Sequence, residues 1–471
     1  MSLGEEVPEV TPRHLVYLHE DIWREIFLQC VDSESTHVGI SLVLLIICQV
    51  CSNWRTLAIS APELWARQTI ILGKGTTGLI PRREWLDLTF HRARGYLLDL
   101  HINGGTEALP PLIYDQANIS SFIFPMLSRV RKLNLNPTDF FTREDLAKLP
   151  ESGAPQLEEL LLTEPSCGYS HRPNLLCSRI WANSHRLRHL SISQKLDCDF
   201  EWLNIDMMIP FHQLTHIHID SPISEAQCLA LLRASQGLRS FEVYKFSRLV
   251  TLEKPFWEPV IVPNLERLYL QAENHSMGSS SKSLYNLLSF IEAPSLSHLH
   301  LTRIHTGEFG FQDASIYKSA HKLKVLKLAI EYLFPEDILT LLEDHGMHLE
   351  ILELEPLSTQ AWCYSAAGAM SEVIKRLDVW DEDSQAFALC PNLEQFAINA
   401  GSLSPARRGS KSTPFADMVE HRGSKGRLRS VSVYDCDPMS RPPGDITRLM
   451  DLKSSGITGI FISNRGQQRI T

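Results

Sequence analysis

The sequence predicts an α/β solenoid of irregular repeats, each with one short strand and one helix, preceded by a small three-helix module. Two observations carry this prediction. A hexamer with apolar residues at its first, fourth and sixth positions recurs from residue 130 onward, and three helical patterns lie close together within residues 15–67. A chain of 471 residues is also too long for one ordinary core, which suits several domains or one elongated array.

Residues 1–14, MSLGEEVPEVTPRH, are expected to form a flexible N-terminal tail. The segment is acidic and contains prolines. It has neither the basic start nor the apolar stretch of a signal peptide.

The first predicted helix is LHEDIWREIFLQC, residues 18–30. Leu18, Ile22 and Ile26 recur every four residues, and Trp23 and Phe27 follow one step round, so the apolar stripe is broad. Such a stripe must pack on its own domain or on another protein.

Two more helices complete the module. The run ISLVLLIIC, residues 40–48, is far shorter than the ~20 residues that span a bilayer, so we expect a buried helix. The third helix, from Val50 through Trp54, ends near Pro62. Cys48 and Cys51 form C-x-x-C without a second pair at zinc spacing, which favours two small apolar residues on a buried helix over a metal or redox site.

Residues 68–129 are predicted to connect the module to the array and to supply its first elements. Strands are expected at 68–72 and 95–102, with a helix at 82–94 between them. The segment GKGTTG, residues 73–78, followed by Asp99, also fits a dinucleotide-binding pattern. The repeats beyond it take the place of the second half that such a fold needs, which disfavours this alternative.

The array is predicted over residues 130–440, with a C-terminal cap at 441–471. Its twelve hexamers begin at Val130, Leu157, Leu187, Leu214, Leu238, Leu265, Leu296, Leu323, Leu349, Ile374, Leu393 and Leu428. Each ends in period-two alternation, which is typical of a strand, and helical patterns lie between several of them, as at 224–237 and 336–346. Stacked repeats of this kind share one continuous core.

Two long polar segments, 273–283 and 401–427, are expected to be mobile loops. The second is basic and would suit an acidic or phosphorylated partner, although a plain solvated loop is the simpler interpretation. Among the strands, His189, His216 and His218 are predicted to share one face. Three imidazoles could bind zinc, but a polar recognition surface explains them with fewer assumptions.

Composition restricts the function. The net charge of −10 disfavours a general nucleic-acid or anionic-membrane surface and favours a protein partner. Ten scattered cysteines indicate a reducing compartment, so we expect a cytoplasmic or nuclear protein. No G-x-S-x-G, H-E-x-x-H or P-loop motif occurs, and we predict no catalytic residues, metal or cofactor.

Residues 15–67 resemble an F-box, the three-helix motif through which substrate receptors join cullin-type ubiquitin ligases. His19 and Asp21 stand where the motif has Pro and Glu. The resemblance implies binding to a Skp1-type adapter, and through it to a cullin. The residues that it places at the adapter are Leu18, Ile22, Ile26, Phe27, Val50, Cys51 and Trp54.

The array resembles leucine-rich repeats, with phrases such as VPNLERL and APSLSHL, but it lacks a continuous Asn ladder. Together the resemblances imply the substrate-recognition subunit of an SCF-type E3 ubiquitin ligase, which holds an unidentified protein target on the solenoid. The alternative is a non-catalytic leucine-rich-repeat scaffold that uses the adapter without ubiquitin transfer. We expect the target-binding residues to be Tyr244, Arg267, Tyr269, His298, His300 and Trp380.

Overall fold

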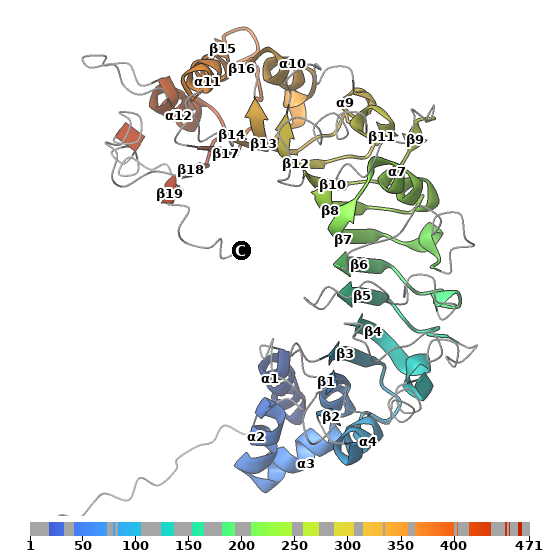
Figure 1. Cartoon of the computed structure of the whole chain (residues 1–471). Coiled ribbons are helices and arrows are strands. Elements are labelled where there is room, and N and C mark those ends of the chain that lie inside the picture. The colour runs from blue at the N-terminus through green and yellow to red at the C-terminus, as the bar shows by residue number, and fades with distance from the viewer. Residues whose placement is uncertain are drawn as a thin grey trace, which may run out of the picture. The chain divides into compact units, whose positions relative to one another are not determined.

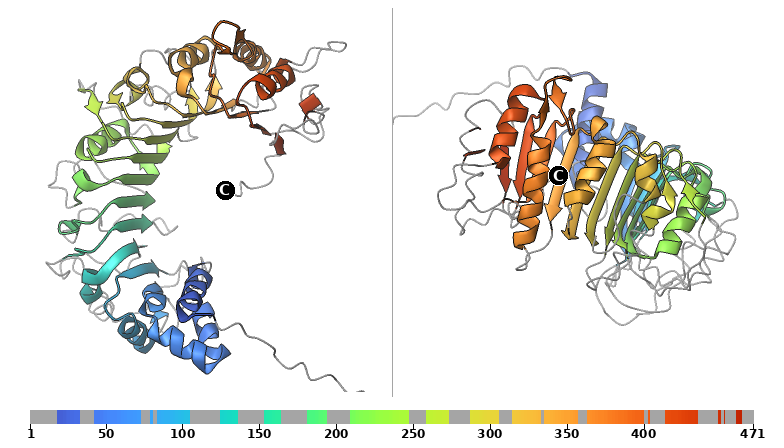
Figure 2. Two further views of the ribbon diagram at one scale, coloured as in Figure 1. Left: turned by 180° about the vertical axis from the view of Figure 1, so that it is seen from behind. Right: turned by 90° about the horizontal axis from the view of Figure 1, so that it is seen from above.

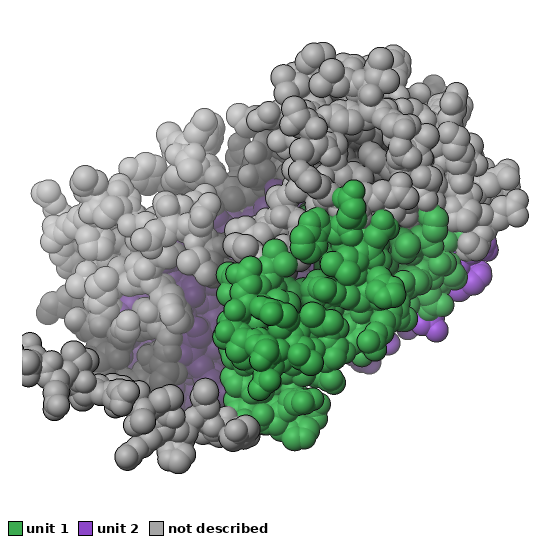
Figure 3. Space-filling model, turned by 90° about the horizontal axis from the view of Figure 1, so that it is seen from below, with its two compact units in different colours: residues 1–174 green, residues 175–471 purple. Residues whose placement is uncertain are grey.

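The computed structural model describes a series of segments along the chain (Figure 1). These are residues 18–32, 42–72, 79–80, 83–104, 124–135, 153–163, 181–193, 209–246, 258–272, 287–305, 314–332, 335–356, 363–399, 403, 414–434, 448–449, 452 and 460–463. The chain forms two compact units, residues 1–174 and 175–471, which are coloured separately in Figure 3. The predicted tail, the glycine segment 73–78 and the loop 273–283 lie outside the described residues.

Unit 1 begins with the three predicted helices, α1 (Glu20–Asp32), α2 (Leu42–Val50) and α3 (Ser52–Ser60), followed by the 3-10 helix η1 (Pro62–Trp65). Aromatic rings hold α1 against α3: the Trp54 ring lies 4.8 Å from that of Trp23 and 5.1 Å from that of Phe27, centroid to centroid. The indole N–H of Trp65 donates to the carbonyl oxygen of Ala58 at 2.8 Å and so fixes η1 to α3.

The rest of unit 1 starts the array as predicted. Its elements are β1 (Arg67–Leu72), β2 (Leu79–Ile80), α4 (Arg83–Arg92), β3 (Leu98–Gly104), η2 (Phe124–Arg129), β4 (Val130–Leu135) and β5 (Glu159–Thr163). The strands lie in the order β2-β1-β3-β4-β5, and only the β1–β2 pair is antiparallel. A parallel β1–β3 pair requires a crossover, which α4 supplies.

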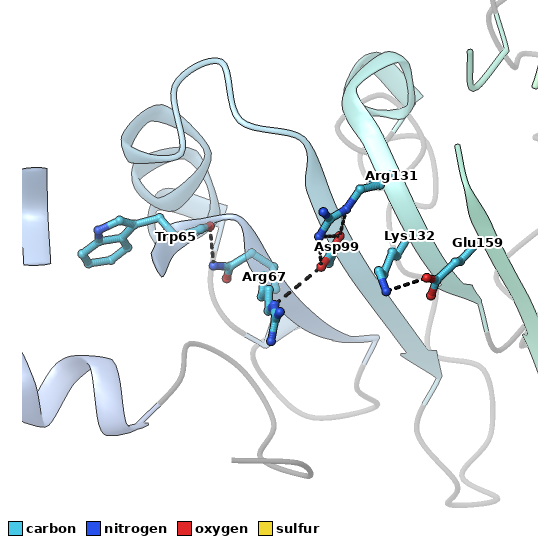
Figure 4. Close-up of polar contacts among 7 residues, drawn as sticks. Trp65, Arg67, Asp99, Arg131, Lys132 and Glu159 are labelled. Atoms are coloured by element: carbon cyan, nitrogen blue, oxygen red, sulfur yellow. Dashed lines mark hydrogen bonds and ion pairs between the residues drawn. The ribbon is translucent and has the colours of Figure 1, made fainter. Parts of the chain in front are cut away.

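Side-chain ion pairs join these strands (Figure 4). The carboxylate of Asp99 on β3 accepts three hydrogen bonds from Arg131 on β4, at 2.8, 3.0 and 3.1 Å, and lies 3.5 Å from the Arg67 guanidinium on β1. Lys132 and Glu159 make a 2.6 Å pair between β4 and β5. Asp99, the acidic residue of the dinucleotide-binding alternative, therefore binds two arginines and has a structural role.

Unit 2 consists mainly of parallel strands whose order in the sheet follows the chain. They are β6 (His189–Ser193), β7 (His216–Ile223), β8 (Ser240–Phe246), β10 (Arg267–Ala272), β12 (His298–His305), β13 (Val325–Tyr332), β14 (Ile351–Pro356), β17 (Gln395–Asn399), β18 (Ser430–Tyr434) and β19 (Ile460–Ser463). Two small sheets accompany them, the parallel pair β9 (Val260–Ile261) with β11 (Ile291–Glu292) and the antiparallel pair β15 (Trp380–Asp381) with β16 (Ala386–Phe387).

Helices cover one face of this sheet, as Figures 1 and 2 show for α7, α9 and α10. The helical elements are η6 (Phe211–Gln213), α7 (Glu225–Ala234), α9 (Ser315–Ser319), α10 (Pro335–His345), η8 (Gly346–His348), α11 (Cys363–Leu377) and α12 (Pro414–Lys425). The buried strand residues point toward these helices, and the alternating residues form the opposite face, which we call the strand face. The core is thus the apolar layer between strands and helices, as expected for stacked strand–helix repeats.

A backbone ladder replaces the missing Asn ladder. From β6 onward, the second residue of each strand-forming hexamer offers its carbonyl oxygen to two N–H groups of the next repeat: Thr215 and His216 both donate to Arg188, at 2.9 and 3.0 Å, and Arg239 and Ser240 both donate to Thr215. In the same way, two N–H groups of the following repeat donate to each of the carbonyl oxygens of Arg239, Glu266, Ser297, Lys324, Glu350 and Glu394. From β6 to β18 the repeats therefore stay in register at the strand starts without a recurring side chain.

Two predictions about unit 2 were wrong. The hexamer at Ile374 lies in α11, because Met370, Val373, Ile374 and Leu377 are buried at helical spacing, and β14 pairs directly with β17. The predicted loop 401–427 contains α12, whose residues Phe415, Met418, Val419 and Arg422 are buried at helical spacing. Each of the other eleven hexamers overlaps a strand, as predicted.

Strand β19 was not predicted, because residues 441–471 were expected only to cap the array.

Among the described residues, no helix is long and apolar enough to cross a membrane.

Candidate interaction surfaces

The helical module of unit 1 carries large aliphatic side chains that its own core leaves in solvent. Ile22 and Ile26 on α1 are 48% and 37% exposed, and Ile46 and Val50 on α2 are 52% and 55% exposed. Each pair is spaced i, i+4 and therefore lies along one line of its helix. Ile59 on α3 is also 37% exposed. Among the ten large hydrophobic residues exposed in the described parts of the chain, five thus belong to these three short helices.

The core of the module takes the other side of each helix. Phe27 is 1% exposed and Leu44 and Ile47 are 1% and 5% exposed, so the aromatic and leucine positions fill the interior. A partner could not reach Phe27 directly. Leu18 and Trp54 are half-buried, and Trp54, which contacts Phe27, connects the core to the surface.

The expectation that 40–48 is a buried helix was wrong for part of α2. Its sequence is apolar on every side, but α1 and α3 cover only the side with Leu44 and Ile47. Cys51 is also not on a buried helix: its backbone is extended (φ −157°), and it separates α2 from α3. It is exposed, and its Sγ accepts a hydrogen bond from the N–H of Trp54 at 3.5 Å, capping α3.

A second hydrogen bond, beside the Cys51 cap, fixes the connection between α2 and α3. The Arg55 Nε donates to the carbonyl oxygen of Cys48 at 2.7 Å, which satisfies an acceptor at the end of α2. The exposed positions of α2 and α3 are therefore held on a fixed backbone. Sequence reasoning missed Ile46 and Ile59, although their helical positions opposite Leu44 and Leu57 could have identified them.

The strand face of unit 2 carries a row of aromatic rings. The ring of Tyr244 on β8 lies 4.7 Å from that of His218 on β7 and stacks 4.4 Å from that of Tyr269 on β10, centroid to centroid. Tyr269 in turn meets His300 on β12 edge to face at 4.5 Å. Three of the predicted target-binding residues, Tyr244, Tyr269 and His300, are thus in contact across three strands.

Glu242 fixes one end of this row. Its carboxylate accepts hydrogen bonds from His218 Nδ1 at 3.2 Å, from Ser240 at 3.3 Å and from the Tyr244 hydroxyl at 3.4 Å. The hydrogen bond from His218 is the main reason that the pKa of Glu242 lies below its ordinary value. Burial, together with the charge of Glu242, raises the pKa of Tyr244 to about 12, so the phenol stays protonated. The Tyr244 ring is therefore held as a neutral, ordered surface.

The two remaining strand-face predictions, Arg267 and His298, are adjacent. They are the first residues of β10 and β12 and form a register pair, and both are exposed. His216 lies on the same row, one strand beyond Ser240, and its ring is 4.4 Å from that of His189.

Trp380 does not lie on the strand face. It is in the β15–β16 hairpin, where its ring contacts Phe387 at 5.0 Å and the Lys425 ammonium lies 5.0 Å from it. The segment that was expected to form the strand leading to Trp380 belongs to the helix α11 instead.

Arg422, one of the basic residues of the predicted loop, is buried and donates to the carbonyl oxygens of Leu377 and Cys390 at 2.7 and 2.9 Å.

No group of three or more His, Cys, Asp or Glu side chains within the described segments is arranged to hold a metal ion. His218 binds Glu242, and the Nδ1 of His216 lies 2.8 Å from the hydroxyl of Thr215, so each ring has its own neighbour.

Comparison of the sequence with protein-family models gave no match, and comparison with the curated proteins gave none either.

Proposed function

We propose that this protein is the substrate-recognition subunit of an SCF-type ubiquitin ligase, in the cytoplasm or nucleus. The helical module of unit 1 binds a Skp1-type adapter, and through it a cullin. The strand face of unit 2 holds the target protein. In this proposal the chain performs no chemistry itself, because ubiquitin transfer belongs to the other subunits.

The observation that carries the proposal is the set of exposed aliphatic side chains on α1 and α2. Fully burying an isoleucine or valine that water now contacts contributes about 1.5–3 kcal/mol, so Ile22, Ile26, Ile46 and Val50 offer a strong driving force for association. Exposed apolar groups gathered on one small module indicate an interaction site. They include three of the residues that the F-box resemblance assigns to the adapter.

The second support is the division of labour between the units. The set of exposed aliphatic residues on α1 and α2 belongs to unit 1, whereas the aromatic and charged strand face belongs to unit 2. An adaptor needs two such surfaces of different chemistry, because each must select a different partner.

Adapter binding is tested by replacing Ile22 and Ile26 with Asp in the full chain. A carboxylate placed in an apolar contact has no partner and costs several kcal/mol, so capture of a Skp1-type adapter should fall by about 100-fold or more. The matched control is Ile261→Asp with Val379→Asp, since these aliphatic residues of unit 2 are 55% and 44% exposed. Equal adapter capture by wild type and the Ile22/Ile26 variant would reject the proposal.

A scaffold that uses the adapter without ubiquitin transfer is the alternative. Purification of the full chain with the proteasome inhibited should bring down both the cullin and the target. Deletion of residues 15–67 should lose the cullin, keep the target and lengthen the target's lifetime. A target lifetime unchanged by the deletion would favour the scaffold.

A further inference from the structure

We propose that the strand face of unit 2 recognises a protein segment bearing a single carboxylate, and that the guanidinium of Arg267 is the group that binds it. This inference rests on the proposed function in one respect, since the segment would belong to the target protein. It adds the chemical class of the segment and the residue that selects it.

The position of Arg267 is central on the strand face. In register it lies between Ser240 on β8 and His298 on β12, with His216 beyond Ser240. Ser240 is only 2% exposed, so the longer side chains around it cover it, whereas Arg267 itself is exposed. The guanidinium is therefore accessible above a closed surface.

The charges of the strand face leave Arg267 without a counter-charge. Three carboxylates of the strand face already have cationic or hydrogen-bonding partners: Glu242 with His218 at 3.2 Å, Asp220 with Lys245 at 3.0 Å and Glu353 with Lys327 at 2.9 Å. The guanidinium of Arg267 makes no hydrogen bond or ion pair with any residue that the structure describes. A carboxylate from outside would complete the pairing, and an arginine can bind it through two parallel hydrogen bonds.

The two flanking histidines indicate that the bound group carries one charge. Burial is the main cause that lowers the pKa of His216 and of His298 below the ordinary value, and the positive charge of Arg267 lowers both further. Both rings are thus neutral near pH 7, which leaves Arg267 as the one fixed positive charge on its row in β6–β12. One guanidinium balances one carboxylate, whereas a phosphate with nearly two negative charges calls for a second cation.

The hydrogen bonds of these histidines agree with this assignment. The hydroxyls of Thr215 and Ser297 donate to backbone carbonyl oxygens, at 3.2 and 3.0 Å, and each lies 2.8 Å from the Nδ1 of the following histidine. Since each hydroxyl proton is used, Nδ1 of each ring donates to the hydroxyl oxygen. In the neutral ring the remaining nitrogen, Nε2, is then the acceptor.

The aromatic row supplies the rest of the surface. Tyr269 is two residues from Arg267 on β10, and the Tyr269 hydroxyl donates to the Gln271 side chain at 2.6 Å, which fixes the ring. Ordered tyrosines lose little conformational entropy on binding and are enriched at interface centres, together with arginine. The partner segment therefore has a residue with a carboxylate side chain, next to a residue whose side chain offers apolar surface to the tyrosines.

The test uses the purified full chain and four libraries of short peptides that differ only in a fixed central residue, which is Asp, Asn, phosphoserine or Lys. We expect the Asp library to be captured about tenfold better than the Asn library, the size of one charge-assisted pair. Arg267→Gln should remove the preference for Asp. The matched control is Arg239→Gln, because Arg239 starts the neighbouring repeat but has a carboxylate partner, Glu266, at 3.8 Å.

Three results would overturn the inference. Equal capture of the Asp and Asn libraries, or no capture of either, would exclude carboxylate recognition. Stronger capture of the phosphoserine library would assign a doubly charged ligand instead. Equal loss in Arg267→Gln and Arg239→Gln would show a general charge effect. The peptide test needs no adapter, and adapter capture by the Ile22/Ile26 variant needs no peptide, so each proposal can fail alone.

Discussion

At the scale of single residues, the most informative side chain is that of Arg422, whose burial the sequence did not predict. Arg422 looks like part of a basic, solvated segment, yet it is 1% exposed and its guanidinium lies 4.3 Å from the centre of the Phe387 ring. Burial lowers its pKa to about 10, so it remains charged at neutral pH. It joins α12 to the end of α11 and to the segment before β17 through backbone carbonyl oxygens.

Replacing Arg422 with Met should therefore destabilise unit 2. The carbonyl oxygens of Leu377, Leu389 and Cys390 would each lose a charged donor, at about 1–3 kcal/mol for each buried group. Arg422→Lys should not restore stability, because an ammonium cannot reach three acceptors in one plane. Urea unfolding measures the effect. The control is Arg376→Met, whose exposed pair with Glu343 contributes about 1 kcal/mol or less; equal losses would contradict the assignment.

Glu242 predicts a dependence of stability on pH. Its pKa in the folded protein is lower than in the unfolded chain, chiefly because His218 donates to it. The stabilisation is therefore present above the ordinary carboxyl pKa and is lost as the pH falls through the lowered value. We expect Glu242→Gln to be less stable than wild type at pH 7 and to approach it in acid. A stability difference independent of pH, measured by urea unfolding from pH 7 to pH 3, would contradict this account.

At the scale of elements, the capping of α7 shows how a local signal determines a helix start. The Ser224 hydroxyl accepts from the N–H of Gln227 at 3.3 Å, and the Gln227 side chain accepts from the N–H of Ser224 at 2.9 Å. Ser224→Ala should cost about 1 kcal/mol in the free energy of unfolding, since both hydrogen bonds form one capping box. Ser224→Asp should retain most of the stabilisation that the cap provides, because a carboxylate also accepts from the N–H groups of the first turn. Equal stability of wild type and Ser224→Ala would show that packing alone fixes this helix.

The sequence predicts most strands of the array correctly because each alternates apolar and polar residues over a short run. It fails at Ile374, because Ile374 and Leu377 also share one face of a helix; the buried Met370 and Val373 before them decide the outcome, and Val379 lies beyond α11 and is exposed. Helix α12 was missed because glycines and serines around it obscured the helical spacing from Phe415 to Arg422. The backbone ladder could not be predicted, since it involves no particular side chain.

Some residues of the candidate sites could likewise be predicted from the sequence, and others could not. Periodicity identifies which residues of a strand share a face, and it correctly placed Tyr244, Tyr269 and His300 together. It cannot tell which side of an all-apolar helix is covered, because that depends on tertiary packing, and so the exposure of Ile46 was missed. The assignment of Trp380 failed together with the strand that was expected to carry it.

At the scale of the whole molecule, the two units have different kinds of stability. The helical module in unit 1 is small and leaves aliphatic surface in water, so binding of a partner should stabilise it. In unit 2 each strand pairs with its neighbours in the chain, so stability accumulates from one repeat to the next. Partner binding at the module and at the strand face should therefore be separable by substitutions.

The double hydrogen bonds at the strand starts have a consequence for how such a chain can change. From Leu187 onward, the hexamers that form strands begin 24 to 44 residues apart, yet the same two amides of each strand meet the same carbonyl of the strand before it. Insertions and deletions in the connecting segments therefore leave the spacing of the strand face at about 4.8 Å per repeat. The distance between two recognition residues on a target is matched by the number of repeats that separate their contacts, independently of connector length. Duplication of one repeat would move every later contact along the target by one such step.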